Sequence, residues 1–268
     1  MKLISYKNNG NIKLGAFEEG KIYDLHALDG HIADNMLEFL QGGEEQLQLA
    51  RAAMEDGSPT ISAEDVELIS PIPNPPSVRD AYAFRQHVAT ARRNRGLEMI
   101  PEFDEIPIFY FTNHHAVFGK GDFPVLSRHT EKLDFELECA AVIGKGGRNI
   151  SVIDADDYIA GFMIMNDLSA RALQMQEMKL NLGPAKGKDF GSTFGPWLVT
   201  KDELEPYKKS SADGDRYDLK MKAFVNDIQV SGDTLSNMTW TFAQIIERAS
   251  HGTDLFPGDI IGSGTCGT

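Results

Sequence analysis

The sequence predicts an α+β fold that is mainly β, with a mixed and largely antiparallel sheet. Three observations support this: strand-like segments outnumber helical ones, the two types do not alternate regularly, and the first strands are separated by short turns. A regular alternation of strands and helices would instead indicate a doubly wound parallel sheet. The sequence contains no internal repeat and no low-complexity tract.

The first 26 residues read as short strands joined by turns. The strand-like segments are 2–6, 12–17 and 21–25. The sequence Asn-Asn-Gly at 8–10 lies between two of them and is typical of a hairpin turn. Residues 35–54 then show a helical pattern, which is either continuous or broken at Gly42-Gly43.

Prolines mark a change in the chain near residue 70. The stretch 71–76, Pro-Ile-Pro-Asn-Pro-Pro, can form neither a helix nor a central strand. We therefore predict a small N-terminal β/α domain at residues 1–70 and a larger second domain at residues 71–268.

The second domain is predicted to contain both element types. Helical patterns cover 80–95, 169–178 and 239–251, and strand patterns cover 132–144, 158–165, 195–200 and 219–225. Gly96 is expected to end the first of these helices. Thr239 is the expected N-cap of the last one, and Gly252 follows its end.

Composition restricts the class of protein. With 41% hydrophobic residues the chain can form a full core. The net charge of −14 is opposite to the basic footprint of a nucleic-acid binder, so no nucleic-acid partner is expected. No stretch reaches the roughly 20 apolar residues that span a membrane, and no signal-peptide pattern is present. Two cysteines, Cys139 and Cys266, cannot form a disulfide framework, so a cytoplasmic location is expected.

An acidic pattern within 132–144 is the first indication of chemistry. Alternation along a strand places Asp134, Glu136 and Glu138 on one face and apolar residues, beginning with Leu133, on the other. The acidic face is either simply exposed to solvent or a site for a hard divalent cation, which takes carboxylate oxygens. Asp167, which follows the apolar segment 158–165, is either a helix N-cap or a third ligand at a strand end.

Three further groups are candidates for the same site. In the predicted helix 80–95, Asp80 and His87 are seven residues apart and share one face, although a lone histidine is also common on an ordinary helix. Lys188 follows a glycine and either approaches a substrate or lies in a surface loop. The basic run at 92–95 is either a solvated helix face or a source of positive potential for an anionic substrate.

Taken in order, five segments resemble the fumarylacetoacetate hydrolase family. They are RDAYAFRQH, DFELECAAVIGKGGRNI, YIAGFMIMNDLSARALQ, KGKDFGSTFGPWLVT and PGDIIGSGT. The ordered set is specific and extends from about residue 78 to the end. The resemblance implies a mixed β-roll catalytic domain after a smaller N-terminal domain, and it suggests a homodimer. Because the family continues beyond the GSGT segment, the chain is expected to be truncated at its C-terminus.

The resemblance also assigns roles to single residues. The metal ligands it implies are Asp80, Glu136, Glu138 and Asp167. The catalytic residues it implies are His87 as general base, with Lys188 and Gln174 at the reacting oxygens. The substrate contacts it implies are Tyr82, Arg95 and Thr265. The metal is expected to be Mg²⁺ or Ca²⁺, with Mn²⁺ as a third option.

The chain departs from the family pattern at two places. No glutamate that would orient His87 can be named from the sequence. The substrate-site tyrosine expected around 109–111 has no clear equivalent, and His114 or His115 is the candidate for its place.

These assignments predict a metal-dependent hydrolase that cleaves a C–C bond in a small anionic β-diketo acid, such as fumarylacetoacetate or an acylpyruvate. His87 would take a proton from water, and Lys188 and Gln174 would stabilise the oxyanion. The alternative on the same scaffold is a decarboxylase of an oxaloacetate-type β-keto acid or a keto–enol isomerase. An acidic partner beside His87 would favour hydrolysis. A rival of another class is a cation-binding module without catalysis, in which Lys188 and His87 need not approach the metal.

Overall fold

The first strands form the antiparallel meander that the turn sequences predict. The computed structural model describes residues 1–267. Its first strands are β1 (Lys2–Asn8), β2 (Asn11–Glu18) and β3 (Lys21–Asp24), and each pairs antiparallel with the next. Between β1 and β2, Asn9 and Gly10 take positive φ angles of 50° and 82°, as a tight hairpin turn requires. The hairpin prediction is confirmed.

Helices follow these strands, and one junction between them lies at a glycine. The helices are α1 (Leu25–Leu28), α2 (Met36–Gln41) and α3 (Gly43–Asp56). Gly42 is both the C-cap of α2 and the N-cap of α3, so the predicted helical region is broken there. Two short strands, β4 (Ile61–Ser62) and β5 (Glu67–Leu68), then pair with β3 and β1.

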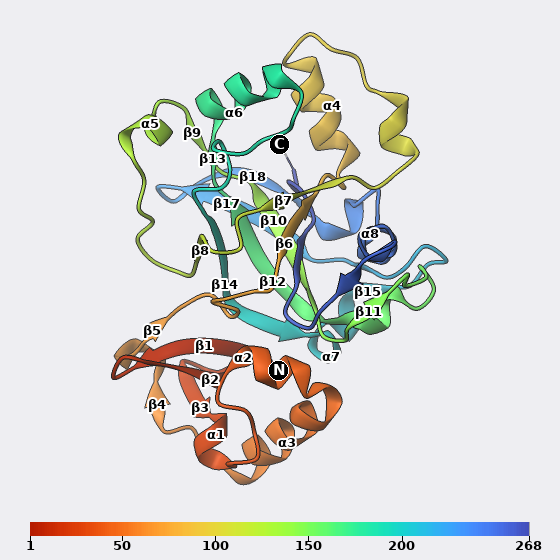
Figure 1. Cartoon of the computed structure of the whole chain (residues 1–268). Helices are drawn as coiled ribbons and strands as arrows, with labels where there is room; N and C mark the ends of the chain where they lie inside the picture. Colours follow the sequence, from red (N-terminus) through yellow and green to blue (C-terminus); the bar gives the residue numbers. More distant parts are fainter. Residues whose placement is uncertain (268) are drawn as a thin grey trace.

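Seven further strands complete one large sheet. They are β6 (Val78–Ala81), β7 (Phe109–Thr112), β8 (Val117–Phe118), β10 (Leu137–Ile143), β12 (Ile159–Asp167), β14 (Ser192–Thr200) and β20 (Ile260–Gly262). Within residues 1–267 this sheet has 12 strands, in the order β4-β3-β2-β1-β14-β12-β10-β20-β6-β7, with β5 and β8 beside β1 and β14. Two pairs, β20 with β6 and β14 with β8, are parallel. Figure 1 shows the sheet extending from the N-terminal strands at the bottom to β6 and β7. The predicted fold class is confirmed.

Shorter elements surround this sheet. The further helices are α4 (Arg85–Arg93), α5 (Ser127–Thr130), α6 (Arg171–Glu177), α7 (Lys201–Leu204) and α8 (Phe242–Ser250). Four small sheets pair β9 (Leu133–Asp134) with β13 (Ser169–Ala170), β11 (Gly147–Arg148) with β19 (Asp254–Leu255), β15 (Lys208–Lys209) with β16 (Arg216–Tyr217), and β17 (Lys220–Val225) with β18 (Ile228–Thr234), all within residues 1–267.

The predicted helix at 80–95 is wrong in its first part. Residues Val78–Ala81 are all buried and form β6, because they are hydrogen-bonded between β20 on one side and β7 on the other. These pairings outweigh the helical pattern of the segment, and α4 begins only at Arg85. Asp80 and His87 therefore lie on different elements and do not share a helix face.

The predicted strand at 132–144 is interrupted. β9 ends at Asp134 and β10 begins at Leu137, because β9 pairs with β13 instead of continuing beside β12. Leu133, which was expected on an apolar face, is 43% exposed. Glu136 lies in the gap between the two strands, and this break sets the position of its carboxylate.

The other predicted elements differ by a few residues. The observed strands extend to Asp167 in β12, begin at Ser192 in β14 and begin at Lys220 in β17. Thr241, and not the predicted Thr239, is the N-cap of α8, where its side chain forms a capping box with Gln244. The hydroxyl of Thr239 instead accepts from the backbone N–H of Arg85.

Alternate residues of β10 enter two separate cores. Cys139, Ala141 and Ile143 pack in one core together with residues of α8. Ala140 and Val142 pack in the other core with residues of β1, β2 and α2. A strand that is buried on both faces lies at the centre of the molecule, and its end therefore provides a water-poor place for charged groups.

The N-terminal segment belongs to the same sheet as the rest of the chain. β1 pairs antiparallel with β14, with Lys2 opposite Val199 and Leu3 opposite Leu198. Backbone hydrogen bonds therefore join residues 1–70 to the strands of residues 71–268. The predicted boundary near residue 70 falls between β5 and β6, and it stays a prediction.

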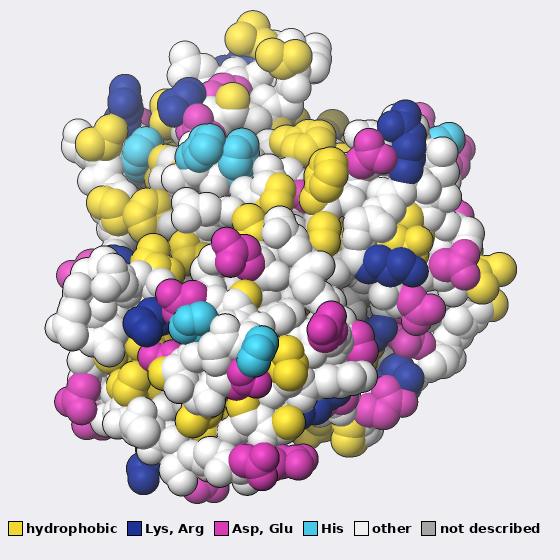
Figure 2. Space-filling model, turned by 60° about the horizontal axis from the view of Figure 1, so that its bottom comes forward, with side chains coloured by type: hydrophobic (Ala, Val, Ile, Leu, Met, Phe, Trp, Pro, Cys, Tyr) yellow, Lys and Arg dark blue, Asp and Glu magenta, His cyan; other side chains and the backbone are white. Residues whose placement is uncertain are grey.

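The surface formed by the N-terminal segment agrees with the acidic composition. Figure 2 shows acidic side chains spread over this face, with only scattered basic ones between them. In the part of the chain that the structure describes, no helix is long and apolar enough to cross a membrane.

Candidate metal centre and active site

Three buried carboxylates converge where β6, β10 and β12 come together. Asp80 lies in β6, Glu136 directly precedes β10, and Asp167 is the last residue of β12. One oxygen of each lies within 4.8 Å of the others. The register explains this, because Leu137 is opposite Asn166 in the β10–β12 pair. Oxygens at such separations can share one hard cation, whose oxygen distances are about 2.0–2.6 Å.

The fourth predicted ligand, Glu138, lies beside Asp80 and not within this group of three. It is fully buried, and neither of its carboxylate oxygens has a hydrogen-bond partner among residues 1–267. A Cβ at Gly262 would lie 2.6 Å from Oδ1 of Asp80 and 3.0 Å from Oε2 of Glu138. The two carboxylates therefore meet at a glycine because no larger side chain fits there.

Burial raises the pKa of both carboxyl groups in this pair. Burial, followed by the charge of Asp167, raises the pKa of Asp80 to about 7. Burial, followed by the charges of Asp80 and Glu136, raises the pKa of Glu138 well above its usual value. Without a compensating cation, these groups are the ones that would take up protons.

Two basic side chains balance the other carboxylates. The Lys188 ammonium donates to Oε2 of Glu136 at 2.7 Å and to Oδ2 of Asp167 at 2.6 Å. Arg171 donates to Oε1 of Glu136 at 2.8 Å and to Oδ2 of Asp134 at 2.8 Å. Burial alone would raise the pKa of Glu136, but Lys188 and Arg171 outweigh it and lower the pKa to about 2.

The charge balance fits a divalent cation. Four buried carboxylates face two cations, so the cluster has two uncompensated negative charges. The carboxylates without a cationic partner are Asp80 and Glu138, and Glu138 has no hydrogen-bond donor in the described chain. Orphaned buried carboxylates are costly unless a cation pairs with them. Asp80, Glu136 and Asp167, together with Glu138, are therefore suited to hold one divalent metal ion.

The structure adds two residues around Asp167 that the sequence reasoning missed. The Tyr110 hydroxyl donates to Oδ2 of Asp167, and the Ser192 hydroxyl donates to Oδ1 at 2.9 Å. Tyr110 lies in β7 directly opposite Asp80 in β6. This position is in the segment where a site tyrosine was sought, and the alternation of Phe109, Tyr110 and Phe111 was the signal that could have identified it.

His87 lies near this cluster in α4 and has no acidic hydrogen-bond partner among residues 1–267. Its Nδ1 is buried without any partner, and its ring contacts Tyr82 edge to face with centroids 5.9 Å apart. Burial lowers the pKa of His87, Arg171 and Lys188 lower it further, and Glu136 and the backbone of Gly267 oppose the shift. The imidazole is therefore held in its neutral form, which can accept a proton.

The other predicted site residues have fewer links to the carboxylates. Arg95 is exposed just after α4, and its Nε donates to the Ala91 carbonyl at 3.1 Å. Gln174 lies in α6 and accepts from Arg171 at 2.9 Å, and its backbone lies against Gly187, the residue before Lys188. Thr265 follows Gly264, whose N–H donates to Oδ1 of Asp80 at 3.2 Å. Lys188 and Arg171 contact the carboxylates directly, whereas among residues 1–267 no side-chain hydrogen bond joins Arg95 or Thr265 to them.

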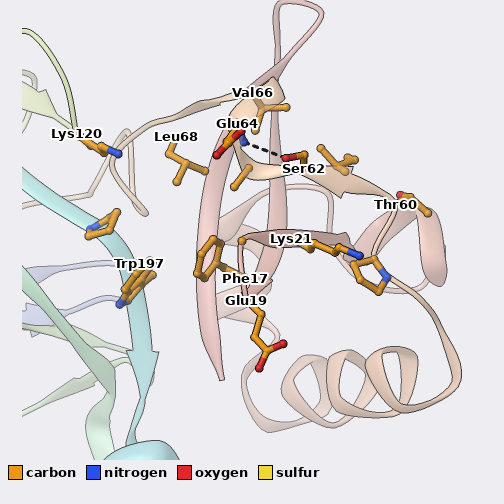
Figure 3. A pocket seen from close by; sticks show the side chains of 15 residues that line it. Phe17, Glu19, Lys21, Thr60, Ser62, Glu64, Val66, Leu68, Lys120 and Trp197 are labelled. Atoms are coloured by element: carbon orange, nitrogen blue, oxygen red, sulfur yellow. Dashed lines mark hydrogen bonds between the residues drawn. The ribbon is translucent and has the colours of Figure 1, made fainter.

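Surface hollows elsewhere do not coincide with this cluster. One hollow of about 1090 Å³ opens where residues of β2, β3 and β4 face Trp197 of β14 (Figure 3). Phe17 and Trp197 stack there with ring centroids 4.8 Å apart. In the described chain none of the four predicted metal ligands lines it. We therefore take the buried carboxylates, and not this hollow, as the candidate active site.

A buried carboxylate cluster with an internal lysine, at the centre of a mainly antiparallel sheet, defines a metal-binding enzyme site. The model of the fumarylacetoacetate (FAA) hydrolase C-terminal family matches residues 77–268. The chain belongs to the fumarylacetoacetate hydrolase family.

Individual relatives differ in the reaction that their names give. The chain is 30% identical over 246 residues to the mitochondrial oxaloacetate tautomerase FAHD2A of Bos taurus, covering 92% of this chain and 73% of the relative. It is 36% identical over 159 residues to the fumarylacetoacetase of Arabidopsis thaliana, covering 51% of this chain and 38% of the relative.

A solved structure supports the fold. Maleylpyruvate hydrolase from Sphingobium sp. SYK-6, in complex with manganese (II) ion and pyruvate, matches with a TM-score of 0.75 and 24% identity. The match covers 100% of this chain and 89% of that chain. At this level of identity the likeness shows the fold alone.

Proposed function

We propose that the chain is a metal-dependent enzyme that interconverts the keto and enol forms of a small 2-oxo dicarboxylic acid of the oxaloacetate type. Similarity to an oxaloacetate tautomerase over 92% of the chain supports this reaction. A buried His87 whose pKa is lowered supplies a neutral base that this reaction can use. This choice favours the isomerase alternative over the hydrolase that the sequence reasoning put first.

The observation that carries the proposal is the similarity to an oxaloacetate tautomerase over 92% of the chain. The environment of His87 is compatible with this reaction. Moving a proton between carbon and oxygen of the same substrate requires a neutral base but no activated water. A lowered pKa provides that neutral base.

The metal fits the proposal through the ligands already described. When bound, a divalent cation at this cluster polarises a carbonyl oxygen and stabilises negative charge on it. Asp80, Glu136 and Asp167, with Glu138, would hold the ion. Oxygen ligands and two uncompensated charges suit Mg²⁺, Mn²⁺ or Ca²⁺.

The protein's own groups have separate tasks in this proposal. Lys188 has three ammonium donors and uses two of them on Glu136 and Asp167, so one remains for a substrate oxygen. Among residues 1–267, Arg95 uses only Nε on the Ala91 carbonyl, so its terminal N–H groups remain for a substrate carboxylate in fork geometry. His87 takes a proton from the carbon beside the carbonyl and passes it to the carbonyl oxygen, which gives the enol, and the reverse transfer restores the keto form.

Hydrolysis of a C–C bond remains the second candidate. It is favoured by the 36% identity to a fumarylacetoacetase over 159 residues. In that reaction His87 would take its proton from water, and Lys188 with Gln174 would donate to the oxyanion. The two candidates use the same carboxylates but differ in their products.

Product analysis with purified protein distinguishes the two. The substrates are oxaloacetate, an acylpyruvate and fumarylacetoacetate, each with Mg²⁺ or Mn²⁺ in excess. A tautomerase speeds the loss of the ultraviolet absorbance of the enol and releases no smaller acid. A hydrolase releases two acids from the diketo substrates. If the diketo substrates release two acids and the enol of oxaloacetate is lost no faster than without protein, the protein is a hydrolase and the second candidate replaces the proposed function.

Two wider expectations from the family resemblance stay proposals. We expect a homodimer, which light scattering on the purified protein would test. We also expect a cytoplasmic location, although the name of the bovine relative gives a mitochondrial one.

A further inference from the structure

An aromatic cluster lies against the segment that carries Lys188. The His129 ring stacks on Phe190, with centroids 4.3 Å apart and an interplanar angle of 24°. Phe190 also contacts Phe123 edge to face at 5.9 Å, and Phe123 contacts Phe118 at 4.7 Å. Phe190 is two residues after Lys188. The cluster therefore packs against backbone that lies close in sequence to the residue with the ammonium group.

The same segment is fixed on its other sides. The backbone N–H groups of Lys188 and Asp189 both donate to the Ala185 carbonyl, at 3.0 and 2.8 Å. A Cβ at Gly191 would lie 2.5 Å from the Phe123 ring, so the rings pack directly on the backbone there. The turn and the aromatic cluster therefore together fix where the Lys188 side chain begins.

His129 is buried in a stretch that is otherwise mostly exposed. Its exposed fraction is 6%, whereas the neighbouring Leu126 is 54% exposed. Nδ1 of His129 accepts from the Leu126 N–H at 3.2 Å, and the proton of the neutral ring is then on Nε2. Burial, followed by the charges of Arg128 and Lys186, lowers the pKa of His129 and favours this neutral form.

A simple packing role would explain a buried histidine on its own. Two features go beyond packing: the ring faces Phe190 in a stacked geometry, and its short helix α5 contacts both β13 and α6, which border the site. Figure 1 shows α5 beside β9 and β13, on the side of the molecule where α6 lies. The position therefore connects an exposed stretch, residues 120–130, to the segment of Lys188.

We infer that His129 is a positioning residue, which holds the Lys188 ammonium between Glu136 and Asp167 by stacking on Phe190. His129 does not contact the reacting groups and acts only through residues 187–191. Its kinetic consequence rests on the proposed function, in which Lys188 donates to a substrate oxygen. Its structural consequence, a fixed Lys188 segment, does not depend on which reaction the protein catalyses.

Three substitutions at this position separate stacking from hydrogen bonding. His129→Phe keeps a stacked ring and removes the Nδ1 acceptor. His129→Asn keeps an acceptor for the Leu126 N–H and removes the stack. His129→Ala removes both. His31→Ala is the matched control, because the His31 side chain is 89% exposed in the N-terminal segment.

Steady-state kinetics give the first measurement. A displacement of a reacting group by about 1 Å costs on the order of 100-fold in rate. We expect His129→Ala and His129→Asn to lower kcat by about 10- to 100-fold with little change in KM. His129→Phe should keep most of the wild-type kcat. Equal activity in His129→Ala and His31→Ala would overturn the inference.

Amide hydrogen exchange gives a second measurement that needs no substrate. In His129→Ala, exchange of the Lys188 and Asp189 amides should become faster, while exchange in β1 and β2 stays as in the wild type. His129→Phe should restore slow exchange. Unchanged exchange at these two amides, or rescue by Asn in place of Phe, would show that His129 only caps the Leu126 turn.

The two measurements also separate this inference from the proposed function. A wild-type protein without turnover on any substrate would contradict the proposed function, and exchange would still decide whether His129 positions the segment. If His129→Ala fails to fold, His129→Phe and His129→Asn provide the same contrast. Normal kcat and exchange in His129→Asn would then overturn the inference.

Discussion

The Lys188 ammonium lies 2.6 Å from Oδ2 of Asp167, and both side chains are almost completely buried. The same ammonium lies 2.7 Å from Glu136, so one cation joins carboxylates that come from the ends of two neighbouring strands. Truncating one partner of a buried ion pair leaves the other charge without compensation, which typically costs about 3–5 kcal/mol.

The first prediction follows from this pair. Lys188→Met should lower the free energy of unfolding by about 3–5 kcal/mol when no metal is added, because Glu136 and Asp167 lose the cation that they share. Denaturant titration measures the change. Lys7→Met is the matched control, because Lys7 pairs with Glu67 at 2.7 Å on the exposed surface, where such pairs contribute about 0–1 kcal/mol. Equal losses in the two variants would contradict the buried role of Lys188.

Metal removal should destabilise the protein. Asp80 and Glu138 are buried side by side without a cationic partner, so a bound cation stabilises the folded state. A divalent metal at about 100 times its Kd adds about 2.7 kcal/mol to the free energy of unfolding. The melting temperature should fall with chelator and rise again with excess Mg²⁺ or Mn²⁺. A melting curve that is identical under both conditions would count against a tight site.

Glu138→Gln should separate stability from metal binding. Without metal, the variant should be more stable than the wild type, because it removes one of two facing carboxylates whose pKa values are raised. With metal, it should gain less stability than the wild type does. Glu136→Gln should instead be less stable without metal, since Glu136 accepts from both Lys188 and Arg171. Melting curves of both variants, with and without metal, measure these differences in stability. A metal-free Glu138→Gln variant that is less stable than the wild type would contradict the prediction.

Tyr110→Phe tests a residue that only the structure assigned to the site. It removes the hydroxyl that donates to Asp167 and leaves the ring in place. A hydrogen bond to a charged group contributes about 1.5–3 kcal/mol, so metal affinity or kcat should fall by about one to two orders of magnitude. Titration calorimetry and kinetics measure the two effects. Tyr207→Phe is a suitable control because Tyr207 is exposed. If Tyr110→Phe has the same metal affinity and kcat as Tyr207→Phe, Tyr110 has no role in the site.

His87 should contribute a pH dependence to stability. Burial lowers the folded-state pKa of His87 below the usual histidine value of 6.5, so between the two pKa values the unfolded state binds a proton that the folded state does not. This contribution to stability is complete above pH 6.5 and is lost as the pH falls toward the folded-state pKa. His87→Gln should therefore lose less stability than the wild type on acidification below pH 6.5. Urea unfolding across that range, with His31→Gln as control, would reveal the difference, and parallel curves would refute it.

Local signals in the sequence predicted much of the fold. The Asn-Asn-Gly turn predicts the first hairpin, and Gly42 marks the break between α2 and α3, because positive φ angles and helix ends have direct sequence signatures. The helix over residues 80–84 was wrong because the pairing of β6 with β20 and β7 joins segments far apart in the chain. Periodicity within one segment does not contain that information.

Only part of the site could be predicted, because the rest of it also depends on contacts between segments far apart in the chain. The alternation of Glu136 and Glu138 and the strand-end position of Asp167 pointed to carboxylates in one place. The contacts of Lys188 with Glu136 and of Tyr110 with Asp167 depend on which strands are neighbours, and a single sequence does not show this. The missing partner of Glu138 likewise becomes visible only when all surrounding donors are known.

The pairing of β1 with β14 has a consequence for how the protein unfolds. β14 is hydrogen-bonded to β1 on one side and to β12 on the other, and β12 ends at Asp167. Loss of the N-terminal strands would leave the part of β14 around Leu198 and Val199 as a free sheet edge, which is prone to pair with other chains. We therefore expect one calorimetric transition for the whole chain, and aggregation of a fragment that begins at residue 71.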